Sequence, residues 1–276
     1  MKILLSCLII ILMGLSGAAV QAKDHLVLYD HFHSEFLDAT KWSGSQTISG
    51  ATILEYVREI RGGRLQLSNR AFGNRSSDSG RSIGTLRLCS AAFPGEFTTT
   101  RASVKVEDVE VTGCPSNSTP TSAFAELLGF FFNTFGPPYN GVQNNVLGLV
   151  QIRRLSNSTD KPCILEVMGG FVHCTDPDCL TWDVASVKKL GNVKLRESVT
   201  IQVEWDQHNE EFIFKLDKEP PQFISYSSYG WTIYPPSFRQ ACLQAKNQIA
   251  NCTAERQMGF VDADFDGVFI NEGAVP

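Results

Sequence analysis

Three aspartates near the end of the chain have the spacing of the first half of a calcium-binding loop. Asp262, Asp264 and Asp266 occupy alternate positions and are followed directly by Gly267. Carboxylate oxygens are the ligands that Ca²⁺ prefers, and a glycine permits the sharp turn of such a loop. However, Gly273 stands where a complete loop has glutamate, and the apolar residues after Gly267 are typical of a strand. A structural calcium site and a polar strand edge therefore both remain open.

Aromatic and amide side chains are concentrated in two segments that also contain Gly and Pro-Pro pairs, a composition typical of loops. Aromatic rings stack on the C–H faces of sugars and planar amides hydrogen-bond to hydroxyls, so these segments are candidates for a glycan site. The alternative is that the rings cover the open end of a hydrophobic core. The candidate ligand-binding residues are Trp231, Tyr229 and Tyr226 in one segment and Tyr139 and Asn140 in the other.

The charge balance argues against some classes of partner. The net charge is −5, which does not favour nucleic acid or an anionic membrane surface. Seven arginines nevertheless lie between Arg58 and Arg87, a segment without lysine. These arginines are expected to lie on solvated strand faces and in loops. The alternative is a stripe that binds anions, because the guanidinium fork matches carboxylates and sulfates.

The first residues have the pattern of an export signal. Lys2 precedes the apolar run Ile3–Leu15, and the small residues Val20 and Ala22 stand before Lys23 at the positions that a signal peptidase requires. We therefore expect a signal peptide at residues 1–22 and a single mature domain at residues 23–276. The protein is expected to be secreted or periplasmic, with no membrane span after signal cleavage.

The chain contains eight cysteines, a number typical of an exported protein with disulfides. Cys174 and Cys179 bracket a short loop that a disulfide can close, and Cys242 and Cys252 are expected to form a second pair. The spacing leaves the pairing of the remaining cysteines of the mature chain open. These are Cys89, Cys114 and Cys163.

Hydrophobic alternation predicts the core strands. In Thr200–Leu216, Ile201, Val203 and Trp205 alternate with polar residues. After the turn, Phe212, Phe214 and Leu216 alternate with Ile213 and Lys215, so the two runs indicate a hairpin with one apolar face. Phe124–Phe132 is apolar on both faces and predicts a central strand.

Two other segments interrupt this simple alternation. The extra residue at Glu107-Asp108 indicates a β-bulge in the strand Ala102–Val111. The segment Pro236–Asn251 has apolar residues at a period of 3.6 and predicts one helix. The fold expected is therefore all-β, a two-sheet jelly-roll sandwich with one helix in the C-terminal region.

Several short motifs resemble concanavalin A-like lectin/glucanase domains, a superfamily of jelly rolls. Asp30-His31-Phe32 with Leu37-Asp38 and Lys41-Trp42 is similar to the opening of these domains, and Gly63-Arg64-Leu65-Gln66-Leu67 to the strand that follows. Two later motifs resemble the late strands of the superfamily, namely Val203-Glu204-Trp205-Asp206 and Phe265-Asp266-Gly267-Val268. The resemblance implies two packed sheets, glycan binding or cleavage, and a structural Ca²⁺ near Asp266.

The glucanase branch of this superfamily carries a catalytic strand of the form E-x-D-x-x-E, because a retaining mechanism needs two carboxyl groups about 5 Å apart. This chain lacks the motif. Glu107, Asp108 and Glu110 have a different spacing, and Glu126 stands alone in an apolar strand. We therefore expect a secreted, non-catalytic protein that binds a polysaccharide or cell-surface glycan. The alternatives are a divergent glycoside hydrolase and a structural envelope protein.

Overall fold

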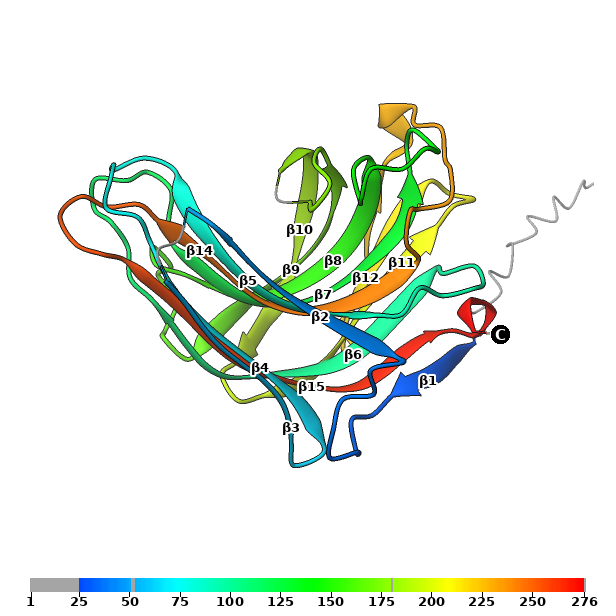
Figure 1. The fold of residues 1–276 in the computed structure, drawn as a ribbon, viewed down its shortest axis with the longest axis horizontal. Helices are drawn as coiled ribbons and strands as arrows, with labels where there is room; N and C mark the ends of the chain where they lie inside the picture. Colours follow the sequence, from blue (N-terminus) through cyan, green and yellow to red (C-terminus); the bar gives the residue numbers. More distant parts are fainter. Residues whose placement is uncertain (1–24, 51–52, 180, 276) are drawn as a thin grey trace, which may run out of the picture.

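The computed structural model of the protein describes residues 25–50, 53–179 and 181–275. In this part of the chain the strands form two antiparallel sheets, one of eight strands and one of seven, which pack face to face (Figure 1). The all-β sandwich predicted from the sequence is therefore confirmed. The predicted signal peptide lies outside the described residues. No helix in the described part is long and apolar enough to cross a membrane.

The eight-stranded sheet has the order β13-β12-β11-β6-β15-β4-β3, with β1 paired to β15. Its strands are β1 (Leu26–Asp30), β3 (Ile53–Arg61), β4 (Arg64–Phe72), β6 (Thr99–Val111), β11 (Ser198–Asp206), β12 (Glu211–Leu216), β13 (Gln222–Ser225) and β15 (Met258–Asn271).

The seven-stranded sheet has the order β10-β9-β8-β7-β14-β5-β2. Its strands are β2 (Trp42–Ser49), β5 (Arg81–Ser90), β7 (Ser122–Asn133), β8 (Asn145–Leu155), β9 (Ile164–Cys174), β10 (Trp182–Lys194) and β14 (Gln240–Ala250). Two single-turn 3₁₀ helices complete the described elements, at Ser227–Tyr229 and Glu272–Ala274.

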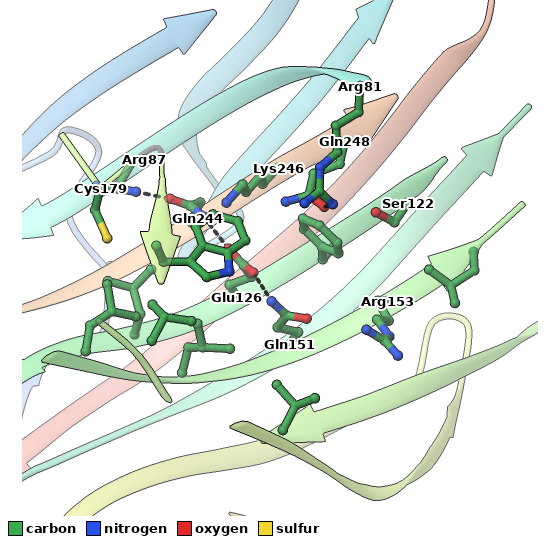
Figure 2. A pocket seen from close by; sticks show the side chains of 18 of the residues that line it. Arg81, Arg87, Ser122, Glu126, Gln151, Arg153, Cys179, Gln244, Lys246 and Gln248 are labelled. Carbon is green, nitrogen blue, oxygen red and sulfur yellow. Dashed lines mark hydrogen bonds between the residues drawn. The ribbon is translucent and has the colours of Figure 1, made fainter. Parts of the chain in front are cut away.

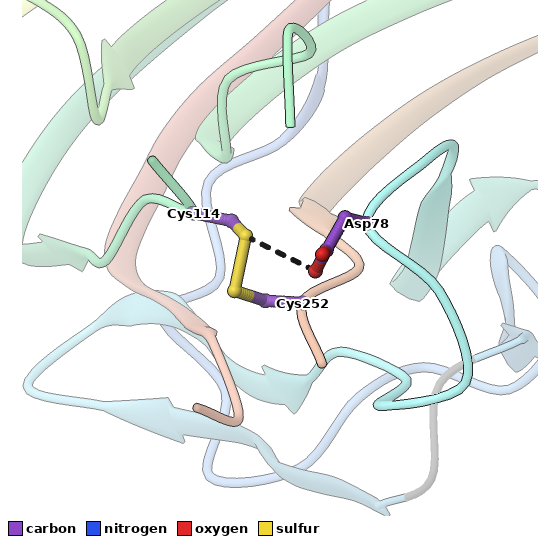
Figure 3. A group of neighbouring side chains, drawn as sticks. All are labelled: Asp78, Cys114 and Cys252. Atoms are coloured by element: carbon purple, nitrogen blue, oxygen red, sulfur yellow. Dashed lines mark hydrogen bonds between the residues drawn. A yellow bond between two sulfur atoms is a disulfide. The ribbon is translucent and has the colours of Figure 1, made fainter. Parts of the chain in front are cut away.

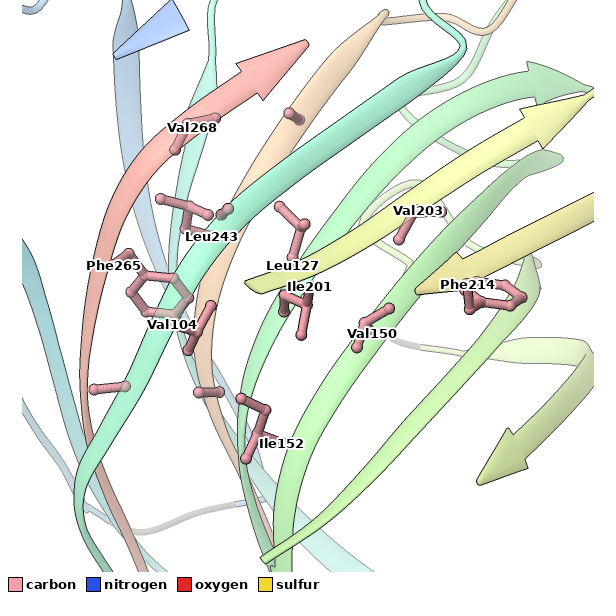
Figure 4. Packing of buried hydrophobic residues seen from close by; sticks show 14 of the residues in the cluster. Val104, Leu127, Val150, Ile152, Ile201, Val203, Phe214, Leu243, Phe265 and Val268 are labelled. Carbon is pink, nitrogen blue, oxygen red and sulfur yellow. The ribbon is translucent and has the colours of Figure 1, made fainter. Parts of the chain in front are cut away.

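The predicted hairpin is present as β11 and β12, and its apolar face is part of the core. Val203 is paired with Phe214 and Trp205 with Phe212, and each of these side chains is at most 7% exposed. Figure 4 shows Val203 and Phe214 between the sheets, with Val150 of the seven-stranded sheet beside them. The alternation predicted the buried face because successive strand residues point to opposite sides of a sheet.

Two further strand predictions are also confirmed. β7 is buried along its whole length and lies between β8 and β14, as expected of a central strand. In the β6–β15 ladder, Asp262 is opposite Asp108 while Ala263 is opposite Val106, so Glu107 is the extra residue of a bulge.

The predicted helix is wrong, because Pro236–Asn251 contains strand β14. Ala241, Leu243, Ala245 and Ile249 point into the core, whereas the even-numbered side chains point to the other face of the sheet. Small apolar residues at these positions satisfy both a period of 3.6 and a period of 2. Pairing on both sides, with β5 and β7, selects the strand.

The disulfides partly differ from the expected pairing. Cys174 is bonded to Cys179, as the short loop between them predicts. The expected Cys242–Cys252 pair is wrong, because Cys242 is directly opposite Cys89 in the β14–β5 ladder and is bonded to it. Cys252 is bonded to Cys114 instead. Cys163 is a free, exposed thiol.

Candidate functional site

A groove lies on the outer face of the seven-stranded sheet. This sheet curves so that the face turned away from the core is concave (Figure 1). The groove has a volume of about 320 Å³ and is formed mainly by β5, β7, β8 and β14 (Figure 2). Its polar and aromatic lining consists of Arg81, Arg87, Thr119, Ser122, Phe124, Glu126, Gln151, Arg153, Trp182, Gln244, Lys246 and Gln248.

Four of these side chains form a hydrogen-bonded row across four adjacent strands. Arg87, Gln244, Glu126 and Gln151 are direct cross-strand neighbours on β5, β14, β7 and β8. Arg87 Nε donates to Gln244 Oε1 over 2.6 Å, and Gln244 Nε2 donates to Glu126. Gln151 Nε2 donates to the other Glu126 oxygen over 2.6 Å (Figure 2). We call these four residues the amide row.

Glu126 acts within the amide row as a hydrogen-bond acceptor. Its side chain is 2% exposed, and each carboxylate oxygen accepts a bond from a different glutamine. A buried carboxylate is costly unless hydrogen bonds replace its water, and here two amide groups supply them. Glu126 therefore holds Gln151 and Gln244 in place along the groove.

A second row of side chains lies one step along the same strands. Lys246 is opposite Phe124, and Phe124 is opposite Arg153. Arg153 donates from Nε and Nη2 to Glu166 over 2.9 and 2.7 Å. Its charge is therefore balanced at the side of the groove by a carboxylate of β9.

Trp182 forms a wall of the groove. The Cys174–Cys179 disulfide closes the loop between β9 and β10, and Trp182 begins β10 at the opposite edge of the sheet from β5. Its ring centroid nevertheless lies 5.3 Å from Lys246 Nζ and 5.9 Å from Arg81 Cζ. The first residues of β10 therefore reach back over the concave face.

Burial changes the protonation behaviour of two cations in the groove. Loss of water around the charge lowers the pKa of Lys246 and of Arg87. The Glu126 carboxylate opposes the shift at both groups, whereas Arg87 and Arg81 add to it at Lys246. Both cations are thus incompletely solvated in the free protein.

The predicted aromatic residues after β13 lie at the end of the sandwich and not in the groove. Tyr226 is 2% exposed, and its hydroxyl accepts a bond from Trp205 Nε1 over 2.9 Å. Trp231 packs against the core, and its ring stacks on Tyr229 at a centroid distance of 4.6 Å. Tyr229 remains 41% exposed. Tyr226 is thus buried, whereas the other two rings reach the surface.

The second aromatic segment is tied to the first. Tyr139 donates from its hydroxyl to the Pro235 carbonyl oxygen over 2.8 Å. Asn140 donates from Nδ2 to Gln143 Oε1 over 3.0 Å, and both predicted residues are exposed. The two segments predicted to form one platform are therefore neighbours, although neither lines the groove.

The three predicted calcium ligands lie on the outer face of the eight-stranded sheet. Asp262, Asp264 and Asp266 alternate with buried residues along β15. Gln66 Nε2 donates to Asp262 over 2.8 Å, and burial, together with the neighbouring Glu107, raises the pKa of Asp264 to about 6. Within the described residues, these aspartates do not bring three ligand atoms within 4.8 Å of one another.

One group in the described part of the chain does meet that distance, but its sulfurs are bonded to each other. It consists of Asp78 and the disulfide-bonded Cys114 and Cys252 (Figure 3). Asp78 accepts bonds from the backbone N–H and hydroxyl of Thr253 over 2.7 and 2.9 Å, and these bonds lower its pKa. The carboxylate therefore fixes the turn after β14.

The sequence contained a signal for the groove that the helix prediction concealed. Read as a strand, β14 alternates apolar residues with Gln240, Gln244, Lys246 and Gln248. The arginine-rich segment is also divided by the fold, because Arg81 and Arg87 line the groove whereas β3 and β4 belong to the other sheet. No comparable local signal marks Gln151 or Trp182.

No protein-family model matches the chain, and no curated protein matches it. The fold is similar to solved glucanase structures, the class of domain that the sequence motifs resemble. The catalytic domain of an endo-1,3-β-glucanase (laminarinase) from Thermotoga petrophila is 12% identical with a TM-score of 0.47, over 90% of this chain and 99% of that one.

Two other similar structures show comparable values. A laminarinase from Flavobacterium is 11% identical with a TM-score of 0.42, over 90% of this chain and 100% of that one. An uncharacterised protein from Mycobacterium paratuberculosis is 14% identical with a TM-score of 0.44, over 87% and 97% of the two chains.

Proposed function

We propose that the protein binds a polysaccharide or cell-surface glycan in the concave groove and does not cleave it. The observation that carries this proposal is the amide row, in which the buried Glu126 and Gln244 fix the half-buried side chains of Gln151 and Arg87 along an open, curved surface. Planar amides hydrogen-bond to sugar hydroxyls, and preorganised groups lose little conformational entropy when a ligand binds. Trp182, which is half-buried, adds apolar surface for the C–H faces of the sugar rings.

The carboxylates of the groove do not favour hydrolysis. Glycosidases use two carboxyl groups, about 5–5.5 Å apart in retaining enzymes and about 6.5–9.5 Å apart in inverting ones. Glu126 is the one carboxylate in the described lining. Its same-face neighbours along β7 are Phe124 and Leu128, and its neighbours across the sheet are the two glutamines of the amide row.

The disulfides support a location outside the reducing cytoplasm. Three of them are formed within the described residues, and such bonds persist in oxidising compartments. Together with the predicted signal peptide, they support a secreted or periplasmic glycan-binding protein.

The aromatic residues at the end of the sandwich are a second candidate surface. Tyr229 and Trp231 are stacked on each other, and Tyr229 is exposed. This site and the groove are separable, because Trp231 does not line the groove and Trp182 does.

The test is a glycan array with the mature protein, followed by affinity measurements on Trp182→Ala and its matched control Trp231→Ala. We expect the Trp182 variant to lose binding while the Trp231 variant retains it. Loss of binding in the folded Trp231 variant alone would move the site to the end of the sandwich.

Incubation of the bound glycan with the protein, followed by measurement of reducing ends, tests the absence of cleavage. No increase is expected. A steady increase that Glu126→Gln abolishes would establish the hydrolase alternative. A folded protein that retains no glycan on the array would favour the structural envelope role.

A further inference from the structure

The groove is positively charged although the protein as a whole is acidic. The net charge of the chain is −5, yet Arg81, Arg87, Arg153 and Lys246 line the groove with the single carboxylate Glu126. A cleft with charges of one sign and low-dielectric walls concentrates its field on the ligand. The charge of the groove therefore bears on which glycan it accepts.

Within the described part of the chain, three of the four cations form no ion pair with a carboxylate. Arg153 is paired with Glu166, but in the described residues no ion pair within 4.0 Å involves Arg81, Arg87 or Lys246. Arg81 Nη1 donates to Gln248 Oε1 over 2.5 Å, and Arg87 Nε donates to Gln244. Lys246 Nζ lies over the Trp182 ring. Their partners are thus neutral amides and an indole.

The one carboxylate of the groove does not neutralise these cations by direct contact. Both oxygens of Glu126 accept bonds from glutamine amides, and the side chain is buried beneath them. Asp178, beyond the lining, acts on Arg87 only through its long-range field. Within the described residues, the free protein therefore presents a cluster of three cations, none of which contacts a carboxylate.

The hydrogen-bonding capacity of the cluster is also incompletely used. The bond from Arg87 Nε leaves its two terminal nitrogens without a partner in the described part of the chain. A guanidinium fork binds a carboxylate or a sulfate through two parallel bonds, and an ammonium adds a point charge beside it. Lys246 and Arg81 lie on the same side of the groove, beneath Trp182.

We propose that the groove recognises an acidic saccharide, with the carboxylate or sulfate of a sugar unit bound among Arg81, Arg87 and Lys246. The neutral hydroxyls of the same saccharide bind to Gln151, the half-buried glutamine of the amide row. This inference rests on the proposed glycan binding and adds the chemical class of the ligand.

The experiment compares matched neutral and acidic polymers by affinity electrophoresis and isothermal titration. Polygalacturonate with its methyl ester tests a carboxylate, and dextran sulfate with dextran tests a sulfate. We expect one acidic polymer to bind at least about tenfold more tightly than its neutral counterpart, the size of one charge-assisted hydrogen bond. The polymer pair that shows this difference in affinity identifies the anion as a carboxylate or a sulfate.

Three charge-neutralising variants locate the site. Lys246→Gln and Arg81→Gln are each expected to weaken binding of the acidic polymer about tenfold or more. Arg101→Gln is the control, because it changes the net charge by the same amount. Arg101 lies on the other sheet, over the Phe269 ring, so this variant should retain full affinity. Arg81 is exposed, so its replacement tests the site even where Lys246→Gln fails to fold.

Several results would overturn this inference. Equal losses of affinity in all three variants would show that only the net charge of the protein matters. Equal affinity for the acidic and the neutral polymer of each pair would contradict the preference for an acidic saccharide. In the second case, loss of neutral-glycan binding in Trp182→Ala would preserve the proposed function. Absence of binding to every polymer and to the glycan array would refute both proposals.

Discussion

Replacement of Glu126 by leucine tests whether this carboxylate organises the groove. The substitution removes both acceptors of the Gln151 and Gln244 amides at once. Gln244 is 1% exposed, so its freed N–H group has no access to bulk water, whereas Gln151 is half-buried and can be rehydrated in part. An unsatisfied buried donor costs about 1–3 kcal/mol, and the loss of the second bond about 1 kcal/mol more.

We therefore expect Glu126→Leu to reduce the free energy of unfolding by about 2–4 kcal/mol. Glu126→Gln is the matched control, because the Gln151 amide can turn over and accept a bond from the new amide group. Its expected loss is at most about 1 kcal/mol, the charge assistance of the original bonds. The two variants thus separate the loss of an acceptor from the loss of a charge.

The assay is urea denaturation of the purified mature protein with the disulfides intact, followed by tryptophan fluorescence. The slope of the transition should be unchanged, so that the midpoint reports stability. Wild-type stability in Glu126→Leu would refute the role given to Glu126. Equal losses in the two variants would show that the charge, and not the hydrogen bonding, matters.

Two further predictions concern the core and the outer face of the eight-stranded sheet. Trp205→Ala should reduce the free energy of unfolding by about 3–5 kcal/mol, because the ring is buried between the sheets. The control Trp205→Phe keeps most of the packing and removes only the bond to Tyr226. A urea midpoint equal to wild type in the alanine variant would contradict this prediction. The pKa of Asp264 is raised to about 6, so the folded state binds this proton more tightly and loses the associated stability as pH rises through about 6. Asp264→Asn should therefore raise the melting temperature at pH 7 and leave it nearly unchanged at pH 4. Equal changes in melting temperature at the two pH values would contradict this prediction.

Local patterns were sufficient for the elements whose environment is uniform along the strand. The hairpin of β11 and β12 and the central strand β7 were predicted because their alternation, or its absence, reflects which faces are buried. The bulge at Glu107 was predicted for the same reason, since one extra residue inverts the alternation.

The prediction failed where one local pattern fits two structures. In β14, Ala241, Ala245 and Ile249 lie on one side of a helix and also on one face of a strand. The expected disulfide joined Cys242, within this segment, to Cys252, just after its end. Pairing with β5 instead places Cys242 opposite Cys89, 153 residues earlier in the chain.

The sequence by itself determined that the chain forms a two-sheet β-sandwich and that the glucanase carboxylate motif is absent. The tertiary structure decided where the functional groups meet. Arg87 and Gln244 are 157 residues apart in sequence, and Glu126 and Gln244 are 118 apart. They become neighbours because the order and register of strands in the sheet align them. Alternation along one strand records which face is buried, but it carries no information about the strand beside it.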